Sequence, residues 1–132
     1  VWNSVPRTFA GRILKKVFRE RLFDYDEYAK FIKSSKIVIN SPSPGGLISP
    51  RYFECMLSKS LIFCENSNLY TNIFKKNFFI FLNEKGNDLN EKLNFYSNNT
   101  SEYNNKIEEA FNEVLSSHTW KNRIDKLLTL IN

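Results

Sequence analysis

The chain of 132 residues contains little of several residue types, and each scarcity excludes a class of protein. It has two cysteines and one histidine, and Cys55 and Cys64 form no CxxC pair, so we expect neither a zinc site nor a disulfide framework. The apolar runs, such as residues 36–39 and 60–64, are far shorter than the roughly 20 residues that span a bilayer. We therefore expect a protein of a reducing compartment, the cytoplasm, with no transmembrane segment.

The composition is that of a folded domain. Hydrophobic residues make up 42% of the chain and charged residues 25%, and the length fits one compact domain over residues 1–132. The first residues, 1–3, include no methionine, no basic region and no apolar region, so we expect no signal peptide. We also expect the chain to be a piece of a longer protein.

The net charge of +5 is carried by the first part of the chain. Residues 1–36 hold nine Lys and Arg against four Asp and Glu, whereas residues 37–132 hold ten of each. The apolar spacing of Thr8–Phe23 predicts an amphipathic helix with a basic face. This face could be solvated, or it could contact an acceptor or a membrane surface. No groove-reading motif accompanies the charge, so we expect no nucleic-acid partner.

Strand-like and helical segments alternate in the middle of the chain. We predict helices over Asp26–Lys33, Pro50–Leu57, Asn68–Phe74 and Leu89–Tyr96, and strands over Ile37–Ile39, Ser60–Cys64 and Phe78–Leu82. The first two strands are short apolar runs of the kind that is buried on both faces of a parallel sheet. The alternation predicts an α/β fold, a Rossmann-like parallel sheet with helices on both faces.

Two C-terminal helices complete the predicted fold, separated by residues 116–118. Their apolar stripes predict that both pack on the body of the domain. The expected packing residues are Ile107, Ala110, Phe111, Val114 and Leu115 in the first helix, and Trp120, Ile124, Leu127, Leu128 and Ile131 in the second.

The loop after the first strand is the best candidate for a ligand site. In a parallel sheet, ligands bind beyond the carboxyl ends of the strands, and a helix N-terminus there attracts phosphate. Arg51 offers a guanidinium for phosphate oxygens, and Glu54, one turn further, could accept hydrogen bonds from paired sugar hydroxyls. The candidate nucleotide- and phosphate-binding residues are Gly45, Gly46, Ser49, Arg51 and Glu54.

Structural explanations compete with these functional ones. The loop could be a simple connection, and Glu54 could be solvated or salt-bridged. His118 stands at a helix boundary, where capping or packing is expected. Tyr52, Phe53 and Trp120 are expected in the core.

Three motifs in order carry a resemblance to a known family. They are the run from Tyr28 to Asn40, the sequence Arg-x-Phe-Glu at residues 51–54 followed by the apolar run 60–63, and His118-Thr119-Trp120 with Arg123. Together they resemble the C-terminal, donor-binding domain of group 1 GT-B glycosyltransferases, especially the spore-maturation-protein-like branch. The similarity covers about Asp26 to Asn132 and implies one half of a two-domain GT-B fold.

The resemblance implies roles for the candidate residues. Glu54 corresponds to the family glutamate that binds the nucleotide ribose, the loop with Gly45 and Gly46 faces the donor diphosphate and sugar, and Arg51 flanks the phosphates. The wider family carries a second glutamate eight residues earlier, where this chain has Gly46. This departure leaves open the alternative of a non-catalytic nucleotide or sugar-nucleotide binding module.

The resemblance also implies the partners. The substrate is a nucleotide-sugar, with no other cofactor and no metal. The acceptor, a polysaccharide, a lipid-linked glycan or a protein glycan, would be held by a missing N-terminal domain, so turnover by this chain alone is not expected. Peripheral contact with the inner face of the membrane is compatible with this function.

Overall fold

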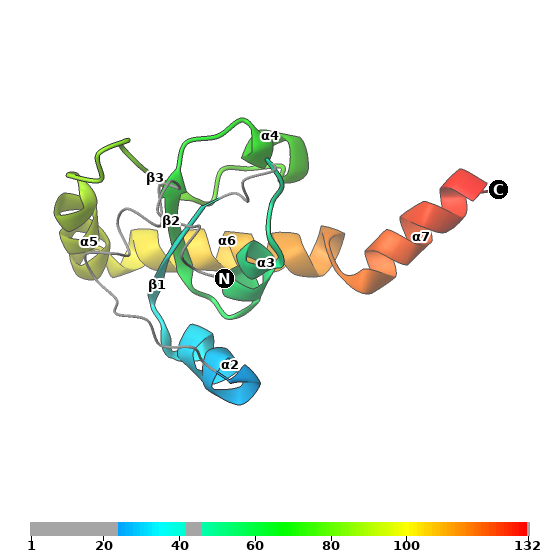
Figure 1. Ribbon diagram of the computed structural model, residues 1–132, viewed down its shortest axis with the longest axis horizontal. Helices are drawn as coiled ribbons and strands as arrows, with labels where there is room; N and C mark the ends of the chain where they lie inside the picture. Colours follow the sequence, from blue (N-terminus) through cyan, green and yellow to red (C-terminus); the bar gives the residue numbers. More distant parts are fainter. Residues whose placement is uncertain (1–23, 42–45, 132) are drawn as a thin grey trace.

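The computed structural model describes residues 24–41 and 46–131 (Figure 1). The predicted basic helix over residues 8–23 lies outside these ranges. The described elements are α2 (Tyr25–Ser34), β1 (Ile37–Asn40), α3 (Pro50–Leu57), β2 (Leu61–Glu65), α4 (Leu69–Ile73), β3 (Ile80–Leu82), α5 (Leu89–Asn98), α6 (Thr100–Ser117) and α7 (Trp120–Ile131).

The strands form a parallel sheet in the order β1-β2-β3. This sheet, with helices on both faces, confirms the predicted Rossmann-like α/β class. β2 is central, and residues 61–64 are buried. β1 is half-buried over residues 37–39, so the prediction that it is buried on both faces was wrong. The reason is its place at the edge of the described sheet, which leaves one side of the strand uncovered.

The third strand is shorter than predicted. The sequence indicated a strand from Phe78, but the ladder begins at Ile80. Phe78 and Phe79 are buried, so their apolar character was a correct sign of the core. The N–H of Phe79 donates to the Asn77 side chain at 3.1 Å, which takes this group out of the ladder.

Each face of the sheet has its own apolar cluster. On one face, α2, α3 and α4 cover Val38, Ile62 and Cys64, and Tyr52, Cys55 and Met56 of α3 are fully buried. On the other face, α5 covers the second set of strand side chains, Ile39, Phe63 and Leu82 among them. Residues of α6 contribute to both clusters, because Ile107 packs on one and Ala110 and Val114 on the other.

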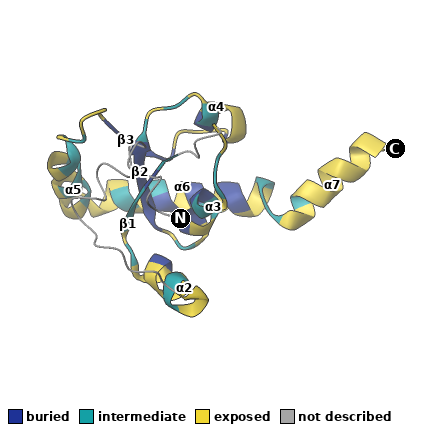
Figure 2. Cartoon of the chain, viewed as in Figure 1, coloured by how far each residue is buried: buried dark blue, intermediate teal, exposed yellow. Residues whose placement is uncertain are grey.

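The last helix does not pack as the sequence predicted. α6 is buried at Ile107, Ala110 and Val114, as expected, whereas Leu115 is exposed. α7 has no buried residue, and Trp120 is 77% exposed. Figures 1 and 2 show the reason: α7 extends away from the sheet and is exposed along its length. Its apolar stripe therefore lies beyond the reach of the core, and the core position predicted for Trp120 was wrong.

Two further observations concern the cysteines and the lengths of the helices. Cys55 and Cys64 are free and buried, and burial raises the pKa of each thiol to about 12. Both side chains therefore stay protonated and behave as small apolar groups. Within residues 24–41 and 46–131, no helix has the length and apolar character needed to cross a membrane.

Candidate functional site

The predicted site lies where the chain passes from β1 into α3. β1 ends at Asn40, so the segment that follows leaves from the carboxyl end of the parallel sheet. Gly45 lies outside the described residues, and the described chain resumes at Gly46. Ser49 is the N-cap of α3 and Pro50 its first residue, as predicted, but the Ser49 side chain makes no capping hydrogen bond. The first turn of α3 thus lacks the side-chain acceptor that an N-cap serine usually supplies.

The backbone conformation at position 46 explains why this residue is a glycine. Its φ of +70° is in the left-handed region, which side chains with a Cβ rarely adopt. No atom lies within 4 Å of a Cβ added there, so backbone shape rather than crowding favours glycine. A glutamate at this position, as in the wider family that the sequence resembles, would require either strain or a different loop path.

Arg51 and Glu54 lie on the side of α3 that faces α2. The Tyr28 hydroxyl of α2 donates to the Glu54 carboxylate, with 2.8 Å between Oη and Oε2. Burial, and then the hydrogen bond to Glu54, raise the pKa of Tyr28, while the nearby Arg51 guanidinium opposes this rise. The hydroxyl is therefore protonated and available as a donor at neutral pH. Tyr28, Arg51 and Glu54 form one polar cluster, which we call the α2–α3 cluster.

The α2–α3 cluster was only partly visible in the sequence. Arg51 and Glu54 were predicted from their spacing after the loop, and they share one side of α3. Tyr28 was named as the start of a family motif, and no local signal marked its hydroxyl as a partner of Glu54. Asn40, buried at the end of β1, was also missed. The sequence feature that could have identified Asn40 is its position: it is a polar residue directly after the β-branched run 37–39.

The closing motif of the sequence packs beside the same helix. The His118 ring lies 5.5 Å from the Phe53 ring and 5.3 Å from the Phe74 ring, between centroids. The Arg123 guanidinium lies 5.2 Å from the Phe53 ring centre. His118 Nε2 is 3.3 Å from the buried Glu113 carboxylate. His118 is the C-cap of α6, so the predicted capping and packing role is confirmed.

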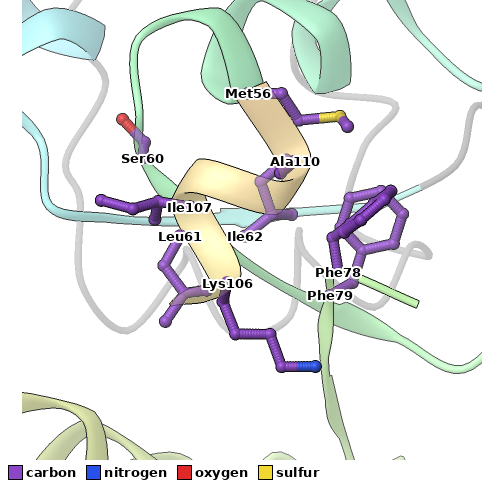
Figure 3. A pocket seen from close by; sticks show the side chains of 9 residues that line it. All are labelled: Met56, Ser60, Leu61, Ile62, Phe78, Phe79, Lys106, Ile107 and Ala110. Atoms are coloured by element: carbon purple, nitrogen blue, oxygen red, sulfur yellow. The ribbon is translucent and has the colours of Figure 1, made fainter. Parts of the chain in front are cut away.

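Two hollows lie elsewhere in the described residues. A crevice between α6 and the sheet is closed by its own side chains and has no room for a water molecule (Figure 3). An open groove of about 580 Å³ runs along α6 near the amino end of β3. Three charged residues line it: Lys76 and Glu109 pair with each other at 3.0 Å, and Glu113 contacts His118. In the described ranges, no group of three or more His, Cys, Asp or Glu side chains could hold a metal ion.

Comparison with known proteins gives one finding. A family model described as glycosyl transferase-like matches residues 2–129. No curated protein and no solved structure gives a significant match. The match spans almost all of the chain, and the parallel α/β fold agrees with a Rossmann-like half of a GT-B fold. The chain therefore belongs to the glycosyl transferase-like family.

Proposed function

We propose that this chain is the donor-binding, C-terminal domain of a group 1 GT-B glycosyltransferase of the spore-maturation-protein-like branch. It would bind a nucleotide-sugar whose sugar is transferred to a polysaccharide, a lipid-linked glycan or a protein glycan. Membership of the glycosyl transferase-like family supports glycosyl transfer in general. The proposal of a donor site rests on one observation: Arg51 and Glu54 follow the N-terminus of α3 at the carboxyl edge of a parallel sheet.

In this proposal, each residue of the segment has a chemical role. The diphosphate binds at the N-terminus of α3, where the helix dipole and the first-turn backbone groups favour an anion. Arg51 contacts a phosphate oxygen, the loop with Gly45, Gly46 and Ser49 lies against the donor, and Glu54 accepts hydrogen bonds from ribose hydroxyls. During transfer, negative charge grows on the leaving diphosphate, and the dipole and Arg51 offset it without a metal ion.

The acceptor belongs to the second half of the proposed enzyme. An N-terminal domain would hold the acceptor and any general base, so this chain alone would bind the donor without turning it over. We place the enzyme in the cytoplasm. The positive charge of residues 7–21 supports peripheral contact of the enzyme with anionic lipid at the inner face of the membrane.

A non-catalytic nucleotide-binding module is the second candidate, and Gly46 favours it. The backbone conformation at this position suits glycine and disfavours the glutamate of the wider family. Joining the chain to its acceptor-binding half separates the two functions. Transfer or hydrolysis of a nucleotide-sugar would indicate an enzyme, and binding without either reaction would indicate a binding module.

Calorimetric titration with UDP, GDP and their sugars tests the donor site. Arg51→Ala and Glu54→Ala should each weaken binding by about tenfold or more, because each removes a charge-assisted hydrogen bond. Glu91→Ala is a suitable control, since Glu91 lies on α5, which covers the other face of the sheet. Binding by the wild type that neither substitution at the site changes would contradict the assignment.

A further inference from the structure

Asn40 is a buried polar residue with an unused donor at the carboxyl end of β1. Asn40 is 4% exposed, and its Nδ2 has no hydrogen-bond partner among residues 24–41 and 46–131. Its Oδ1 accepts from the backbone N–H of Ser41 at 3.0 Å. Because that N–H requires an acceptor, the oxygen is fixed on the Ser41 side, and the NH₂ group must face the other way.

The position of Asn40 in the sheet places it on the α3 face. Side chains alternate along a strand, so Asn40 lies on the same face as Val38, two residues earlier. Val38 packs in the cluster covered by α3, and Asn40 pairs in register with Cys64, whose side chain belongs to that cluster. Residues 41–49 connect Asn40 to α3. Asn40 ends β1, and the N-terminus of α3 follows this connection, so both belong to the carboxyl edge of the sheet.

Two other buried polar groups of this face satisfy each other. The hydroxyls of Tyr52 and Tyr70 are 2.9 Å apart and hydrogen-bonded. Cys64, the register partner of Asn40, is fully buried in the same cluster. Buried amide groups almost always make hydrogen bonds. A buried NH₂ group without an acceptor is therefore unfavourable, unless a bound ligand accepts a hydrogen bond from it.

We infer that the Asn40 amide is a donor-binding group, whose Nδ2 hydrogen-bonds an oxygen of a nucleoside diphosphate held at the N-terminus of α3. This inference rests on the proposed function and adds a residue to its site. It joins two independent features at the carboxyl edge of the sheet: a helix N-terminus, which attracts an anion, and a buried donor that has no partner in the part of the chain that the structure describes.

The test compares two variants by calorimetric titration with UDP and GDP. Asn40→Leu removes the amide with little change of shape, and Asn40→Asp keeps the acceptor for Ser41 but replaces the donor with a carboxylate. We expect Asn40→Leu to raise the Kd by about tenfold or more and Asn40→Asp to raise it further, because a carboxylate repels phosphate. Asn94→Leu, at an exposed asparagine of α5, should leave the Kd unchanged.

Thermal unfolding without ligand provides a second readout. Asn40→Leu should leave the Tm about unchanged or raise it, because it removes the orphaned donor at the loss of one hydrogen bond. A fall in Tm of more than about 10 °C would show that the amide already has a partner within the protein, and would overturn the inference.

The titration also separates the inference from the function on which it rests. Wild-type binding that is lost in Arg51→Ala but retained in Asn40→Leu would overturn only the role of Asn40. Absence of wild-type binding to both UDP and GDP would overturn the donor site and the inference together.

Discussion

The hydrogen bond between Tyr28 and Glu54 fixes the orientation of the candidate ribose-binding carboxylate. The Tyr28 hydroxyl holds Oε2, so Oε1 is the oxygen left to accept from a ligand. The two residues are 26 positions apart and lie on different helices. A substitution in α2 should therefore affect binding at α3 without touching the ligand.

Tyr28→Phe tests this positioning role. The ring keeps its packing and only the hydroxyl is lost, so Glu54 gains rotamer freedom that binding must then restrict. We expect the Kd for the nucleotide to rise by about two- to tenfold, with a small change in Tm because the bond is exposed. Calorimetric titration and thermal unfolding measure the two effects.

The control for this prediction is a double-mutant cycle. In a Glu54→Ala background, Tyr28→Phe should have no further effect on the Kd, because the group that Tyr28 orients is absent. Equal effects of Tyr28→Phe in both backgrounds would mean that the tyrosine acts through packing and not through the carboxylate.

At the scale of elements, α6 and α7 differ in whether their apolar stripe is buried. Both sequences have helical spacing, but α6 runs along the sheet and buries its stripe, whereas α7 begins after the turn at residues 118–119 and extends away (Figure 2). The contact of α7 with the body is at its first turn, where Arg123 lies on Phe53. The helix should therefore contribute little to the stability of the domain.

Truncation after Thr119 tests this expectation. Removal of α7 exposes no core residue, so the Tm should change by less than about 3 °C. Val114→Ala in α6 is the comparison, because it opens a cavity at a fully buried position and should lower the free energy of unfolding by about 2 kcal/mol. A truncated chain that unfolds as readily as the Val114 variant would contradict the role assigned to α7.

At the scale of the whole molecule, the core on the α3 face contains ionisable groups that are held protonated. Burial raises the pKa of Cys55 and Cys64 from 9.0 to about 12, and it also raises the pKa of Tyr52 and Tyr70. At neutral pH both the folded and unfolded chains keep these protons, so the groups give no pH dependence there.

Stability should fall as the pH rises from about 9 to 12. In this range the unfolded chain releases protons that the folded chain retains, which favours unfolding. Denaturant titrations at a series of alkaline pH values measure the effect, and Cys55→Ala should reduce the slope because it removes one of the groups. A free energy of unfolding that stays constant through this range would contradict the burial of these groups.

The sequence alone determined the fold class and the order of the elements. The change from helical to strand-like spacing, the proline and glycine signals, and the short apolar runs are local features, and they located β2 and α3 closely. The break between the last two helices was placed at residues 116–118, but α6 continues to Ser117. The segment from Gly46 to Glu54 was likewise found from local residues: an N-cap, a proline at the first helical position, and charges one turn apart. These features depend on neighbours in the chain, which is why they could be read without the structure.

The tertiary structure decided which side chains from distant parts of the sequence contact one another. It placed the Tyr28 hydroxyl on Glu54, left Asn40 Nδ2 without a partner among the described residues, and took the apolar stripe of α7 away from the core. It also brought His118 and Arg123 onto Phe53. Each outcome depends on how distant segments meet, and periodicity within one segment shows which face is apolar without showing what covers it.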